Sequence, residues 1–262
     1  MERFYSRRTC EFNSANGYFK HEPLLAEKQE GTEKFRVIEG NRRLAALKAL
    51  LGLESLPQGV SLPEISIETL EEIKKVPVIE TTRDGIWQYI GFKHVNGPQA
   101  WQSASKAQYI GWVKNDLGVS LEDIARQIGD HHSTVMRLYR ALMVIEQAEQ
   151  RDVFQRSDRW KSHFSFSHLY TGLDYEGIRG FLKVLPFAEQ SRTPVPDDRI
   201  DELGELCVWL YGSKSRNIPP VVISQNPDLR VLDEVIQKPN GLAALRQRLP
   251  LQISREISKG DD

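Results

Sequence analysis

A glycine followed by two arginines separates a short apolar run from an amphipathic segment near the start of the chain. Residues 35–38 (FRVI) come first, Gly40 follows, and residues 42–51 carry apolar side chains at helical spacing. This order predicts a strand, a tight turn and a helix whose first turn holds Arg42 and Arg43. A strand that leads directly into a helix favours a mixed unit of helices and strands over a purely helical bundle.

The arginines of this motif stand at the end of a helix that disfavours cations. A helix N-terminus carries partial positive charge, so anions are favoured there and cations at the opposite end. Free backbone N–H groups, a glycine turn and guanidinium forks together form a phosphate-binding arrangement. We therefore expect a phosphate or nucleotide site at Gly40, Asn41, Arg42 and Arg43. The alternative is that both arginines are solvated or paired with Glu39.

Length and composition define the broad class of protein. A chain of 262 residues has room for one large domain or two ordinary ones. Its 40% hydrophobic and 27% charged residues are typical of a soluble globular protein. No apolar run approaches the roughly 20 residues that span a bilayer, so no membrane partner is expected. Because the net charge is −1, any contact with DNA must come from a local basic patch.

The cysteines and the N-terminal segment indicate a compartment. Cys10 and Cys207 lie far apart and have no metal-ligand spacing around them, which favours a reducing cytoplasm over a disulfide or zinc framework. Residues 1–8 are basic but are followed by no apolar segment, so a secretory signal is not expected. A cytoplasmic protein is predicted.

The order of elements divides the chain into three parts. We expect an α+β protein with a small mixed α/β domain at residues 1–97, a helix-turn-helix domain at 98–150 and a helical C-terminal domain at 151–262. The first boundary follows from Gly97 and Pro98, after which helical periodicity dominates.

Other elements follow from the same rules. The polar residues at the end of the chain, 254–262, are expected to fray. A β-branched run predicts one more strand, and apolar spacing predicts further helices. The predicted strand spans residues 76–82, and the predicted helices span 69–74, 199–211, 228–237 and 241–248.

A helix-turn-helix motif is predicted in the central part. Ser120 is a good N-cap and has Asp123 three residues on, which resembles a capping box. Gly129 suits the left-handed residue that ends a helix, and a second helix is expected to begin at a Ser or Thr cap. The small side chain of Ala125 lets two helices approach, and Val135 is placed to hold the second helix against the first.

The exposed face of that second helix is expected to carry basic and polar side chains and no acid. Its N-terminal residues would face base edges, and its arginines would meet phosphate or guanine. Such a pattern also occurs in helix pairs that bind nothing, which is the alternative. The predicted DNA-binding residues are His132, Ser133, Thr134, Arg137 and Arg140, with His131 beside them as a capping or DNA-facing residue.

The remaining aromatic and acidic residues have simpler interpretations. Trp87, Trp101 and Trp112 are interleaved with lysines and could stack nucleotides, but core positions are favoured. Asp174 and Glu176 are expected to be solvated loop acids. The sequence holds no recognisable catalytic triad, Walker loop or zinc-protease motif, so no catalytic residue and no metal ligand is assigned.

Taken in this order, the motifs resemble the ParB family, in which a ParB/sulfiredoxin-like domain precedes a helix-turn-helix. Residues 16–19 with 22–25 resemble the family strand that follows its first helix. Residues 37–43 match its G-x-R-R phosphate motif, and residues 76–79 match the strand after it. The resemblance covers roughly residues 15–145.

The resemblance implies a nucleotide-dependent DNA-binding protein. Gly40, Asn41, Arg42 and Arg43 would grip the triphosphate of CTP or another nucleotide, and nucleotide binding would close a homodimeric clamp on DNA. The protein would then be associated with a bacterial nucleoid or a plasmid, in partition or in defence. A protein partner for the C-terminal helices is a further expectation.

The sequence departs from the family pattern in two places. The family's E-N-x-Q-R segment, which holds Mg²⁺ and nucleotide, should fall near residues 91–96, where no Glu-Asn pair occurs. Lys93 and His94 are expected to contact phosphate there, whereas Mg²⁺ is left unassigned and CTPase or other NTPase activity stays open. The family's leading strand and helix are expected to be missing or replaced by residues 1–14.

Two other functions remain open at this point. One is an enzyme of the same fold, either a nucleotide hydrolase or a nuclease. The other is an adaptor protein of a plasmid, phage or defence operon whose helical C-terminus recruits a partner.

Overall fold

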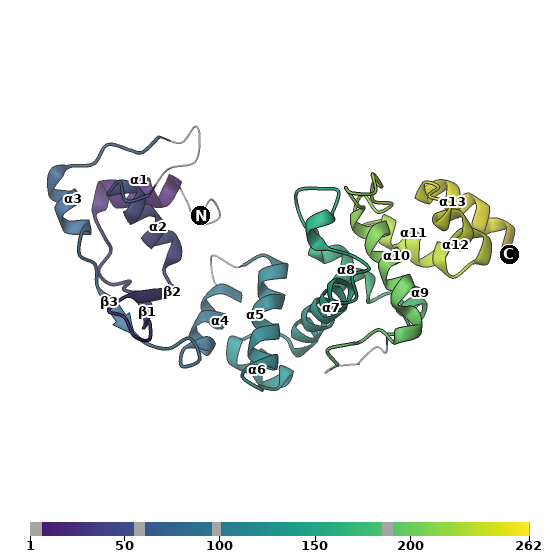
Figure 1. Ribbon diagram of the computed structural model, residues 1–262, viewed down its shortest axis with the longest axis horizontal. Coiled ribbons are helices and arrows are strands. Elements are labelled where there is room, and N and C mark those ends of the chain that lie inside the picture. Colours follow the sequence, from purple (N-terminus) through teal and green to yellow (C-terminus); the bar gives the residue numbers. More distant parts are fainter. Residues whose placement is uncertain (1–6, 55–60, 96–100, 185–190, 262) are drawn as a thin grey trace. The chain divides into compact units, whose positions relative to one another are not determined.

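The computed structural model describes residues 7–54, 61–95, 101–184 and 191–261. The chain divides into two compact units, Met1–Ile90 and Gly91–Asp262 (Figure 1), which are described separately. The predicted boundary at Gly97 and Pro98 lies outside the described residues, so the division into three domains stays a prediction.

The first unit combines a three-stranded sheet with helices, which confirms the predicted α+β class. In the sheet order β2-β1-β3, β1 pairs antiparallel with β2 and parallel with β3. A register shift separates Leu25, opposite Glu39, from Ala26, opposite Val37. The elements are α1 (Arg7–Asn16), β1 (Leu24–Lys28), β2 (Phe35–Glu39), α2 (Asn41–Leu50), α3 (Ile67–Ile73) and β3 (Val78–Glu80).

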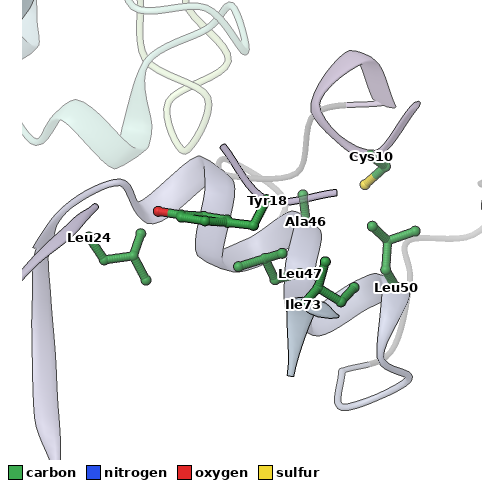
Figure 2. Close-up of a cluster of buried hydrophobic side chains, with 7 residues drawn as sticks. All are labelled: Cys10, Tyr18, Leu24, Ala46, Leu47, Leu50 and Ile73. Carbon is green, nitrogen blue, oxygen red and sulfur yellow. The ribbon is translucent and has the colours of Figure 1, made fainter. Parts of the chain in front are cut away.

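A small apolar core holds the first unit together (Figure 2). Helix α2 contributes Ala46, Leu47 and Leu50 from one face, because these positions recur at helical spacing. Each buried leucine stabilises the fold by about 1.5–3 kcal/mol. The other core side chains come from α1, the turn after it, β1 and α3, and they are Cys10, Tyr18, Leu24 and Ile73.

Helix α1 lies where the family's leading strand and helix were expected to be missing or replaced by residues 1–14. It occupies Arg7–Asn16 and packs against α2, and its relation to the family's helix stays a prediction. Its core residue Cys10 is fully buried, so this helix is part of the fold of the first unit. The sequence did not predict this helix, because its residues are mostly polar and show no clear apolar face.

The regular elements in the described part of the second unit are helices, and Ser213 and Ile218 form an isolated antiparallel bridge. Its long central helix, α7, packs against α5, α6, α8 and α10. Helix α4 (Trp87–Val95) begins in the first unit and continues into the second. The others are α5 (Ser103–Asn115), α6 (Leu121–Ile128), α7 (His132–Gln150), α8 (Phe166–Gly172), α9 (Glu176–Leu182), α10 (Ile200–Tyr211), α11 (Asp228–Ile236), α12 (Pro239–Arg246) and α13 (Leu251–Ser258).

The end of the chain corrects one expectation. Residues 254–262 were expected to fray, but α13 packs against α11 and α12 and buries Ser254 and Ser258. The hydroxyl of Ser254 donates to Pro250 O at 3.2 Å and that of Ser258 to Arg255 O at 2.7 Å. Local backbone acceptors therefore let small polar side chains lie in an apolar contact.

Across the described ranges, we find no helix with both the length and the apolar character needed to cross a membrane.

Candidate nucleic-acid interface

Helix α6 begins and ends as its sequence predicts. Ser120 is its N-cap, and the Ser120 Oγ accepts a hydrogen bond from Asp123 N at 3.0 Å. The same hydroxyl donates to Asp123 Oδ2 at 2.7 Å. The helix ends at Gly129, whose φ of 72° is left-handed and whose N–H bonds to Ala125 O. A glycine adopts this conformation without the steric cost of a side chain.

The turn brings α7 against α6 through the predicted residues. Ala125 is 2% exposed and Val135 is 0% exposed, and α5 packs against both helices. Leu138, one turn after Val135 on α7, is also buried. The predicted helix pair is therefore present, with its apolar faces covered.

The start of α7 differs in its cap from the expected one. The N-cap is His131 rather than Ser133 or Thr134, and no side chain caps the first turn. Asp130 instead accepts from His131 N at 2.7 Å through its Oδ1. Further, the first turn of α7 contains no acidic residue.

The exposure of this first turn agrees with a surface that could meet another molecule. His131, His132 and Ser133 are exposed, and Thr134 is half-buried. These side chains offer imidazole and hydroxyl groups that can both donate and accept hydrogen bonds. Their role as DNA contacts stays a prediction.

The two arginines further along α7 are not equally available. Arg140 is only 11% exposed, and its Nη2 donates to Leu173 O and to Asp174 Oδ1, each at 3.0 Å. The expectation that Arg140 lies on the exposed face is therefore wrong, because the turn after α8 covers it. Arg137 is 39% exposed, and its Nη2 forms an ion pair with Asp174 Oδ2.

Two guanidinium groups, those of Arg137 and Arg140, share the carboxylate of Asp174, and a third, that of Arg179, donates to backbone oxygens beside it. The guanidinium carbon of Arg137 lies 5.3 Å from the ring centroid of Tyr170, within the range of a cation–π interaction. Arg179 donates to Leu173 O at 3.0 Å. Burial lowers the pKa of Arg140 and Asp174 opposes that shift, while Arg179 and Arg137 reinforce it.

Sequence reasoning missed this cluster. Asp174 was expected to be a solvated loop acid, yet it pairs with Arg137 and Arg140. Arg140 and Asp174 are 34 residues apart, so no local pattern connects them. Only the packing of α8 against α7 brings them together.

The glycine of the N-terminal motif has the geometry that its sequence predicts. Gly40 is the N-cap of α2, and its φ of 96° is left-handed. A Cβ at this position would lie 2.5 Å from Leu24 Cδ2, so the close approach of β1 also requires a glycine. The side chain of Asn41 donates to Ile38 O at 3.2 Å and fixes the turn between β2 and α2.

The two arginines of this motif differ in exposure and in their contacts. Arg43 is 17% exposed and forms ion pairs with Glu22 at 3.4 Å and with Glu39 at 3.7 Å. It also donates to Glu22 O and, at 3.3 Å, to the hydroxyl of Tyr18. The alternative of pairing with Glu39 thus holds for Arg43. Arg42 is exposed and has no partner among the residues that the structure describes.

Lys93 and His94 lie in the last turn of α4, in the second unit. The ring of His94 stacks on that of Trp101 with centroids 4.8 Å apart and an interplanar angle of 3°. Trp101 and Trp112 in turn contact Tyr109, but both are only partly buried, so of the three tryptophans only Trp87, at 6% exposed, lies in the core as interpreted. A phosphate site that joins Lys93 and His94 to residues 40–43 stays a prediction.

No group of three or more His, Cys, Asp or Glu side chains could hold a metal ion in the part of the chain that the structure describes.

Comparison with known proteins gives a structural similarity but no match to a family model. No family model matches the chain, and no curated protein matches it. Among solved structures, the chain is similar to the C-terminally truncated chromosome-partitioning protein ParB from Caulobacter crescentus, solved in complex with the centromeric parS site. The match has 14% identity and a TM-score of 0.37, and it covers 77% of this chain and 89% of that one. A match at this level does not establish a common fold, and membership of the ParB family stays a prediction.

Proposed function

We propose that this protein binds DNA through α6 and α7, with the first turns of α7 in the major groove. One observation carries the proposal: α7 starts directly after a left-handed glycine turn and presents exposed polar residues without an acid. In a helix-turn-helix the second helix meets base edges with its N-terminal residues, while the first crosses the backbone.

The side chains at that position suit such a contact. Ser133 and Thr134 can donate to or accept from bases and phosphates, and His131 and His132 add rings that can donate a proton. Arg137 follows one turn later and is more than a third exposed. Because α6 and α5 cover the apolar face of α7, the motif presents these residues from a rigid support.

The test places a negative charge at the proposed interface without harming the helix. In Ser133→Glu the new carboxylate stands in the first turn of α7, where the helix dipole favours it, but it would repel DNA phosphate. We expect the affinity for a mixed-sequence duplex, measured by fluorescence anisotropy, to fall at least about tenfold at roughly 100 mM salt.

Ser105→Glu is the matched control. Ser105 is also exposed and lies in the first turn of another helix of the same unit, α5. It should bind DNA like the wild type. Equal affinity for Ser133→Glu and Ser105→Glu, or a wild type that does not bind DNA, would contradict the proposal.

A second part of the proposal is phosphate or nucleotide binding at the start of α2. The exposed guanidinium of Arg42, the left-handed Gly40 and the first turn of α2, which has no side-chain cap and no acid, support it. CTP is the candidate ligand that the family resemblance adds, together with a homodimeric clamp. Hydrolysis, nuclease activity and a protein partner for the C-terminal helices have no comparable support.

Calorimetry tests the nucleotide part. CTP, ATP and GTP are titrated into the full chain, with and without Mg²⁺. Arg42→Ala should weaken binding of the nucleotide that gives heat about tenfold, the value of a lost charge-assisted contact of ~1.4 kcal/mol. Arg36→Ala removes an exposed arginine from β2 of the same unit and should leave the affinity unchanged. No heat from any nucleotide would contradict this part.

A further inference from the structure

The ion pair between Arg137 and Asp174 joins the proposed recognition helix to a separate part of the fold. Arg137 lies in the second turn of α7, whereas Asp174 lies in the turn between α8 and α9. The carboxylate uses Oδ2 for Arg137 and Oδ1 for Arg140. It therefore occupies Nη2 of Arg137, a donor that a phosphate oxygen would otherwise take.

The two halves of this contact have different environments. Arg140 is 11% exposed and is also bonded to Leu173 O, so its half of the contact belongs to the fold. Arg137 and Asp174 have side chains that are 39% and 37% exposed, which places their pair at the surface. A surface pair is weak and is screened by salt, so another anion can displace it.

We propose that Asp174 competes with DNA phosphate for Arg137 and thereby restrains DNA binding. This inference rests on the proposed function of α6 and α7. When a phosphate approaches, Oδ2 of Asp174 releases Arg137, while Oδ1 stays on Arg140 and the fold is unchanged. The face of Tyr170 keeps the guanidinium of Arg137 in place during the exchange.

The restraint has a consequence for specificity. Phosphate contacts supply most of the affinity for any DNA sequence, whereas base contacts discriminate between sequences. An acid that holds one arginine therefore lowers the affinity for all sequences alike. The contacts of the first turn of α7 with bases then contribute a larger share of the total binding free energy.

Asp174→Asn tests the inference. The amide keeps an oxygen that can accept from Arg140 but loses the charge that holds Arg137. We expect this variant to bind a mixed-sequence duplex roughly three- to tenfold more tightly at about 100 mM salt, with a salt slope steeper by about 0.9, the value of one added phosphate contact. Adding Arg137→Gln to it should return both values to those of the wild type.

Two further variants keep the test decisive. Asp197→Asn removes the acid that pairs with Arg151 at the other end of α7, and it should leave DNA binding unchanged. Arg137→Gln alone should cost less than about twofold, because a phosphate gains Arg137 in the wild type only by displacing Asp174, and the two contacts nearly offset each other. A tenfold cost of Arg137→Gln would contradict the competition even if Asp174→Asn fails to fold.

The outcomes separate the inference from the proposed function. If the wild type binds DNA and Asp174→Asn binds equally or more weakly, or Arg137→Gln alone costs tenfold, the competition is wrong and Asp174 positions Arg137 instead. If neither the wild type nor Asp174→Asn binds DNA, the proposed function itself is wrong.

Discussion

Two helices of this protein, α2 and α7, each carry a pair of arginines. In each pair, one arginine is largely buried and bonded to a neighbouring segment, and the other is more exposed. Arg43 and Arg140 are 17% and 11% exposed and donate to backbone carbonyls of a neighbouring segment. Arg42 is exposed, and Arg137 is 39% exposed. The inner arginine of each pair fixes the helix to the fold, and the outer one remains accessible to a ligand.

An arginine becomes part of the fold when a neighbouring segment offers it two kinds of acceptor. A guanidinium group has five donors in a fixed plane, so it can bond a carbonyl and a carboxylate of a nearby segment at once. Glu22 offers both acceptors to Arg43, and the adjacent residues Leu173 and Asp174 offer them to Arg140. Side-chain type alone therefore does not identify a phosphate ligand.

The largest effect that would test this division is expected at Arg140. Arg140→Ala removes one of the two guanidinium donors to Leu173 O and takes from Asp174 its better-buried partner, which should lower the free energy of unfolding by about 2 kcal/mol. Thermal denaturation followed by circular dichroism measures it, as a fall of roughly 4–8 °C. Arg137→Ala, the outer arginine, should cost less than about 1 kcal/mol. Equal losses would remove the distinction between the two side chains.

A smaller effect of the same kind is expected at Arg43. Arg43→Ala removes the bonds to Glu22 and Tyr18 that tie the start of α2 to the segment before β1, and it should cost about 1–1.5 kcal/mol. Arg42→Ala should change stability by less than about 0.5 kcal/mol. Urea denaturation of both variants compares them, and a larger loss for Arg42→Ala would reverse the assignment.

Local features of the fold could be predicted from the sequence. The cap at Ser120, the turn at Gly129 and the glycine at Gly40 each depend on residues within four positions, and the structure confirms all three. The buried contacts of Ala125 and Val135 followed from helical spacing in the same way. Rules for caps and turns are short-range, so one sequence is enough to apply them.

Features that depend on distant residues could not be predicted. Asp174 reaches Arg140 only because α8 packs against α7, and Ser254 is buried only because α13 packs against α11 and α12. The cap of α7 was also predicted wrongly. Ser133 and Thr134 are suitable caps, but the cap is His131 and the helix already begins at His132. Tertiary packing decides such cases over local preference.

The salt dependence of DNA binding by the wild type tests the central claim most directly. The accessible start of α7 and the surface around Arg137 should contact several phosphates, so the logarithm of the association constant should fall linearly with the logarithm of salt concentration between roughly 50 and 200 mM. We expect a slope of about −3 or steeper, and a shallower slope for Ser133→Glu. A slope near zero, or no binding at the lowest salt, would contradict the assignment of α6 and α7 as a DNA-binding motif.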